Sequence, residues 1–164
     1  MPESLFQYGR YLLLIAVAGL GACATTGDAP KPEAEEIPQV HSPEQAEEWS
    51  RKGKLAHEQG DVEGAIEAWQ QAVQLNPADA VTVNNLALVL KQQDRFDEAA
   101  NLLEKGVKAS PATAELHYNL AVISELYLLD LDKALAHYQR YQTLVAEEDK
   151  MVAGWIADLE RRLQ

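Results

Sequence analysis

Between residues 46 and 148 the sequence repeats itself with a period of 34 residues. The period is visible as identical residues at equivalent places: Ala65 and Ala99, Pro77 and Pro111, Ala80 and Ala114, Leu86 and Leu120, and Ala87 and Ala121. A fixed period of this length is typical of stacked repeats, in which each unit buries its apolar face only against its neighbours. The three units are residues 46–79, 80–113 and 114–148, and the third is one residue longer than the others.

Each unit has the pattern of two helices joined by a tight turn. Small residues recur where two antiparallel helices would touch, and bulky apolar residues recur in the second helix of each unit. The small residues are Gly53, Ala87, Ala121, Ala65, Ala99 and Ala134, and the bulky ones are Trp69, Leu103 and Tyr138. Proline disfavours a helical residue before it, so Pro77 and Pro111 mark helix ends. We expect helices at about 44–58, 62–75, 80–92, 96–109, 114–128 and 131–145.

These units resemble tetratricopeptide repeats over nearly all of the chain beyond residue 43. The first unit matches the family at its fourth, eighth, twentieth, twenty-fourth, twenty-seventh and thirty-second positions, with Trp49, Gly53, Ala65, Trp69, Ala72 and Pro77. The third unit departs from the family by an inserted residue within 128–132 and by Ala146 in place of proline. The resemblance implies an all-α fold, a short α-solenoid of three helical hairpins over residues 44–148.

Residues 149–164 are expected to form a seventh helix that caps the stack. Apolar residues fall on one face of it at spacings of three and four, and charged residues fall elsewhere. The apolar residues are Met151, Val152, Trp155, Ile156, Leu159 and Leu163. A stack of repeats leaves an apolar face open at its end, so a terminal helix with a polar outer side would close it.

Residues 1–22 have the pattern of an export signal. Arg10 precedes an uncharged run of 14 residues, 11–24, which is shorter than the roughly 20 residues that a membrane-spanning helix needs. The residues Leu20-Gly21-Ala22-Cys23 resemble the lipobox of bacterial lipoproteins. This resemblance implies cleavage before Cys23, a lipid anchor on Cys23 and, because Ala24 follows, an outer-membrane protein that faces the periplasm. The alternative is an ordinary secretory signal with an incidental cysteine.

Residues 23–43 have the composition of a tether. They contain four of the seven prolines, several acidic residues and few large apolar side chains. Such a segment cannot bury enough surface to order itself, so we expect an extended spacer between the lipidated cysteine and the repeats. The alternative is a loop that packs on the domain.

A short helical solenoid offers a concave surface lined by the first helix of each unit. The resemblance to the family places the fifth, ninth and twelfth residues of each unit there, and we expect a partner-binding site at Lys54, His57, Asn84, Leu88, Lys91, Tyr118 and Val122. A peptide or a segment of another envelope protein would lie over the apolar residues, with a carboxylate near the two lysines. An equally open alternative is that these lysines are ordinary solvated side chains.

Composition and motifs narrow the remaining function classes. The net charge of −12 repels phosphate backbones, so nucleic acid is not an expected partner. The sequence shows no catalytic motif, no zinc-ligand spacing and no cofactor motif, so we expect neither an enzyme nor a metal or cofactor site. His117 lies at a packing position and is expected to be structural. The main prediction is a lipid-anchored adaptor, and the alternative is a self-associating structural lipoprotein without a peptide ligand.

Overall fold

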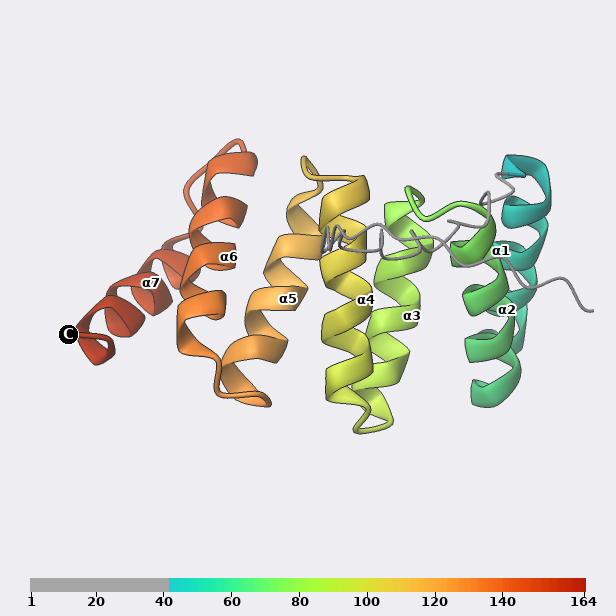
Figure 1. Cartoon of the computed structure of the whole chain (residues 1–164), viewed down its shortest axis with the longest axis horizontal. Helices are drawn as coiled ribbons and strands as arrows, with labels where there is room; N and C mark the ends of the chain where they lie inside the picture. The colour runs from blue at the N-terminus through green and yellow to red at the C-terminus, as the bar shows by residue number, and fades with distance from the viewer. Residues whose placement is uncertain (1–41) are drawn as a thin grey trace, which may run out of the picture. The chain divides into compact units, whose positions relative to one another are not determined.

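The computed structural model describes residues 42–164. The predicted export signal, the lipidation site at Cys23 and all of the tether up to residue 41 lie outside the described residues. The described part contains seven α-helices and no strand. Figure 1 shows how these helices are arranged. The helices are α1 (Pro43–Glu58), α2 (Val62–Leu75), α3 (Ala80–Gln92), α4 (Phe96–Ala109), α5 (Ala114–Leu126), α6 (Leu131–Leu144) and α7 (Lys150–Arg162). The predicted all-α hairpin architecture is confirmed.

Each helix packs on the next one along the chain, from α1 to α7, and α3 also contacts α5 (Figure 1). The pairs α1–α2, α3–α4 and α5–α6 form the three hairpins. Hydrogen bonds between side chains also join the first helices of neighbouring hairpins. Ser50 Oγ lies 2.6 Å from Thr82 Oγ1, and Asn119 Nδ2 donates to Asn84 Oδ1 at 2.6 Å. The first helices are therefore tied side by side.

The turn inside each hairpin uses one residue with a left-handed backbone. These residues are Gly60 with φ 79°, Asp94 with φ 58° and Leu129 with φ 56°. Glycine adopts this conformation without strain and aspartate tolerates it, whereas a leucine there is strained. The inserted residue of the third unit falls in this region, and α5 ends at Leu126, two residues earlier than expected.

Side-chain caps define where several helices begin. The carboxylates of Asp61, Asp79, Asp130 and Asp149 each accept a hydrogen bond from a backbone N–H in the first turn of the following helix. Such caps satisfy backbone donors that have no partner within the helix. Pro43 occupies the first position of α1, where a missing N–H is harmless, so α1 begins one residue earlier than expected.

The core follows the small and bulky positions of the repeat. Ala65, Ala99 and Ala134 are fully buried, and Trp69, Leu103 and Tyr138 are buried beside them. A Cβ atom added at Gly53 would lie 2.5 Å from Cδ1 of Trp69, so the contact between α1 and α2 needs a glycine. The core has two parts, one over α2 to α5 and a smaller one where α7 closes on α5 and α6.

The two ends of the stack expose some apolar residues that the sequence predicts to be packed. Trp49 is 36% exposed, because no hairpin precedes α1 within the described residues. On α7, Val152 and Leu159 are buried and Trp155 packs on the smaller core, but Met151 and, just beyond the last residue of the helix, Leu163 are exposed. The apolar face of α7 is thus narrower than the sequence pattern suggests. Within residues 42–164, every helix falls short of the length and hydropathy required to span a bilayer.

Candidate binding groove

The first helices α1, α3 and α5 form a face that we call the groove face. Three hollows lie on it, and their lining residues occupy equivalent positions in successive repeats, such as Ser50, Asn84 and Tyr118. The entrance cavity has a volume of about 510 Å³ and the middle cavity about 290 Å³, and both lie between α1 and α3. The tyrosine cavity, about 430 Å³, lies between α3, α5 and the residues that join α6 to α7.

Lys54 connects the first two hollows, because it lines both the entrance cavity and the middle cavity. Its ammonium group lies 3.9 Å from Glu58 Oε1 and its side chain is 72% exposed. An ion pair this long and this exposed contributes little to stability, so the ammonium remains accessible to an outside carboxylate. Acidic residues of α1 surround the entrance cavity, including Glu44, Glu47 and Glu48.

The middle cavity has an apolar floor. Leu88, half-buried on α3, lines it together with the edge of Trp69. The His57 ring lies 5.6 Å from the Trp69 ring, and the Trp69 indole N–H donates to the backbone oxygen of Ser50 at 3.1 Å. The hydrogen bond fixes the tryptophan between the helices, so this floor is preformed.

The tyrosine cavity is bounded by aromatic rings and carboxamides. Tyr118 on α5 lies 5.3 Å from Tyr141 and 6.3 Å from Trp155, measured between ring centroids. The hydrogen bond between Asn84 and Asn119 crosses from α3 to α5 at its edge. Burial, the Asp149 carboxylate and its hydrogen bond raise the pKa of the Tyr141 hydroxyl.

The structure therefore brings five of the seven predicted partner-binding residues into the hollows: Lys54, His57, Asn84, Leu88 and Tyr118. The other two line none of these three hollows. Val122 is half-buried and packs on the core beneath α7, and Lys91 is half-buried in the last turn of α3. The assignment of all seven residues to partner binding stays a prediction.

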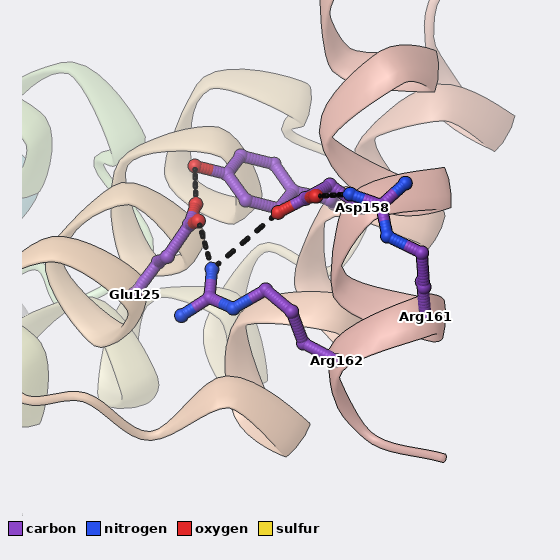
Figure 2. A network of polar contacts seen from close by, with 5 residues as sticks. Glu125, Asp158, Arg161 and Arg162 are labelled. Carbon is purple, nitrogen blue, oxygen red and sulfur yellow. Dashed lines mark hydrogen bonds and ion pairs between the residues drawn. The ribbon is translucent and has the colours of Figure 1, made fainter.

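A polar network holds the C-terminal end of α7 against the groove face (Figure 2). Arg162 Nη1 lies 3.3 Å from Glu125 Oε1, and the Tyr138 hydroxyl donates to Glu125 Oε2 at 3.1 Å. Arg162 also pairs with Asp158 at 3.6 Å, and Asp158 pairs with Arg161. Burial and the Glu125 charge raise the pKa of Tyr138 far above its usual value. Glu125 lies at a groove-facing position of the third repeat, and its carboxylate is therefore already paired with Arg162 of the same chain.

A histidine pair behind the groove face was not predicted. His117, which the sequence predicts to be structural, is buried, and its Nδ1 lies 2.9 Å from Nδ1 of His137 on α6. The Nε2 atom of His117 donates to the carbonyl oxygen of Pro111 at 3.2 Å, so in the neutral pair His137 Nδ1 is the donor. Repeat register could have found this pair, because the equivalent residues Val83 and Leu102 share a hollow in the second hairpin.

The repeats match two profiles of the same family. Residues 53–94 match the profile described as TPR repeat, and residues 84–149 match the profile described as tetratricopeptide repeat. Together these matches extend over more than half of the chain. The chain belongs to the tetratricopeptide-repeat family.

Two curated relatives come from Methanocaldococcus jannaschii. An uncharacterized protein is 32% identical over 74 residues, which are 45% of this chain and 86% of that protein. A TPR repeat-containing protein is 33% identical over 60 residues, which are 37% of this chain and 11% of the relative. The match thus spans about a tenth of that second relative, so it compares repeats rather than whole proteins.

Solved tetratricopeptide domains share the fold. The first TPR domain of Spaghetti (RPAP3), bound to the HSP90 peptide SRMEEVD, superimposes with a TM-score of 0.65 at 18% identity. The superposition covers 76% of this chain and 98% of that domain. At this identity the likeness establishes the arrangement of the helices, and the groove chemistry has to be read from the residues of this chain.

Proposed function

We propose that the chain is a non-enzymatic adaptor of the bacterial envelope, anchored to the outer membrane by lipid, which binds a segment of another envelope protein on its groove face. The observation that carries the proposal is the row of hollows between α1, α3 and α5, in which Trp69, Leu88 and Tyr118 supply apolar surface beside polar side chains. Ligand sites in proteins are concave, mostly apolar and equipped with a few polar groups that orient the ligand. The first TPR domain of RPAP3, which has the same fold, was solved bound to an HSP90 peptide.

The partner segment would lie across the first helices. Leu88 and Tyr118 offer apolar contact in neighbouring hollows, and Val122 lies one turn further along α5. Lys54 would receive a carboxylate of the segment, with Lys91 as a second cation on α3. The side-chain hydrogen bonds between first helices keep this surface preorganised, which lowers the entropy cost of binding.

Co-purification tests the groove. The variant Lys54→Glu/Lys91→Glu/Tyr118→Ala should lose the envelope proteins that co-purify with the wild-type chain. A matched control, Lys105→Glu/Lys108→Glu, changes the charge equally on α4 and should keep them. If the triple variant retains every partner, the groove face is not the binding surface. If no partner is found and the mass of the protein rises with concentration, the self-associating structural role replaces the adaptor.

The lipid anchor rests on the sequence around Cys23. The only cysteine of the chain falls at the end of its uncharged run, directly after Leu20-Gly21-Ala22. One acyl chain gives marginal membrane binding, and two or more hold a protein stably, so a lipoprotein cysteine with two or three acyl chains would be a sufficient anchor. Cys23→Ser should move the protein from the outer-membrane fraction to the soluble periplasmic fraction. Membrane retention of this variant would refute the anchor without bearing on the groove.

A further inference from the structure

The tyrosine cavity differs chemically from the rest of the groove face. Its lining contains two carboxylates, Glu115 and Asp149, and two tyrosines, and it contains no lysine or arginine. By contrast, each of the two hollows near α1 includes the ammonium group of Lys54. The two ends of the groove face therefore offer different groups to a bound segment: a lysine near α1, and carboxylates with tyrosine rings near α5.

The aromatic wall of this cavity is fixed in place. Tyr118 contacts Tyr141, Tyr138 and Trp155, with ring centroids between 5.3 and 6.4 Å away. Tyr138 is fully buried and Trp155 is packed on the core, so they support Tyr118 from behind. A rigid tyrosine face that lines a hollow is a surface on which a lysine or arginine side chain can stack.

The position of the Asp149 carboxylate is also fixed. Its Oδ1 atom accepts hydrogen bonds from the backbone N–H groups of Met151 and Val152, at 3.0 and 3.2 Å. Its Oδ2 atom accepts from the Tyr141 hydroxyl at 3.3 Å. These hydrogen bonds orient the carboxylate. Because all three donors are neutral groups, none of them pairs its negative charge with a positive one.

Glu115 stands on the first turn of α5 and also lines the cavity. Neither Glu115 nor Asp149 takes part in any of the ion pairs found within residues 42–164. Elsewhere on α5 the chain supplies a cation of its own, because Arg162 pairs with Glu125. By contrast, aromatic rings and two carboxylates line the tyrosine cavity, and no lysine or arginine of the chain lines it.

We propose that the tyrosine cavity binds a lysine or arginine side chain of the partner segment, stacked on Tyr118 and paired with Glu115 and Asp149. This assignment rests on the proposed function, because it names the chemistry of the ligand at one end of the same groove face. It also predicts that a segment whose charged side chains are all acidic is a poor ligand at this end. Like charges brought together at an interface disfavour the wrong partner.

Selection from a random peptide pool displayed on phage, with the immobilised full-length protein as target, tests the assignment. Enriched peptides should carry a lysine or arginine next to an apolar residue. The variant Glu115→Gln/Asp149→Asn should bind an enriched peptide about tenfold more weakly, as expected for the loss of charged contacts. Asparagine caps helices as well as aspartate does, so α7 should stay in place. The control Glu67→Gln removes an exposed carboxylate from α2 and should bind like the wild type.

A double-mutant cycle isolates the contact. Replacing the basic residue of the enriched peptide by norleucine should weaken binding to the wild-type protein more than binding to the double variant, which keeps only the stacking on Tyr118. Enriched peptides without a basic residue, or equal binding by both proteins, would overturn the cation assignment and leave the groove function intact. A pool from which no peptide is enriched would contradict the groove function itself, and the cation assignment would fall with it.

Discussion

The contact of Gly53 with Trp69 in the first hairpin is predicted to be intolerant of a single added methyl group. A Cβ atom at residue 53 would lie 2.5 Å from Cδ1 and 2.6 Å from Nε1 of Trp69. Carbon atoms that touch without strain are roughly 3.5–4.0 Å apart, so the overlap is about 1 Å. Trp69 is 3% exposed and its indole N–H is held by Ser50, so the ring cannot move aside without loss.

The free energies can be compared for Gly53→Ala. Overpacking costs about 1–3 kcal/mol, and weakening the indole hydrogen bond costs about 0.5–1.5 kcal/mol. Alanine in place of glycine inside a helix stabilises the folded state by about 1 kcal/mol. We therefore expect the free energy of unfolding to fall by about 2 kcal/mol.

Urea denaturation of the purified protein, followed by far-ultraviolet circular dichroism, measures this change. Gly154→Ala is the matched control, because residue 154 also lies inside a helix but an added Cβ meets no atom within 4 Å. That variant should gain about 0.5–1 kcal/mol from helix propensity alone. If Gly53→Ala is as stable as the wild type or more stable, the tight contact between α1 and α2 is wrong.

Three further predictions concern stability. Asp79→Ala should lower the unfolding free energy by about 1–2 kcal/mol in the same denaturation assay, because the carboxylate caps α3. Leu129→Gly should raise the thermal midpoint, because glycine removes the strain of the left-handed backbone, about 1 kcal/mol, and the exposed leucine side chain buries little apolar surface. Burial lowers the pKa of His117 and of His137, so the unfolded chain binds more protons and stability should fall as pH drops below about 6.5. Denaturation at about pH 7.5 and 5.5 should show a smaller loss in His137→Gln than in the wild type.

The repeat period predicted most of the fold, because the helix contacts are encoded locally and three times over. The small residue at the position of Ala65 and the bulky apolar residue at the position of Trp69 recur in both later units. One pattern therefore places three hairpins. The period could not predict what happens where it is broken. Trp49 matches the family but is exposed, because burial at that position needs a preceding hairpin that the described residues do not include. The insertion near Leu129 likewise made the end of α5 unpredictable to within two residues.

The candidate site was predictable in position but less so in chemistry. The groove positions implied by the family resemblance pointed to Lys54 and Tyr118, and the repeat register carried those positions from one unit to the next. The carboxylate of Asp149 was missed, since it lies after the last repeat and reaches the cavity only through the turn before α7. The pairing of Arg162 with Glu125 was missed for the same reason, because no period relates the capping helix to α5.

Site-specific photocrosslinking in cells tests the central claim, that the face formed by α1, α3 and α5 is where a partner binds. A photoreactive residue replaces Leu88 on the groove face in one strain and Gln71, exposed on α2, in another. The Leu88 probe should give a discrete adduct with another envelope protein, and Tyr118→Ala should abolish it. An adduct formed from Gln71 and absent from Leu88 would place the binding surface on the second helices and contradict the account.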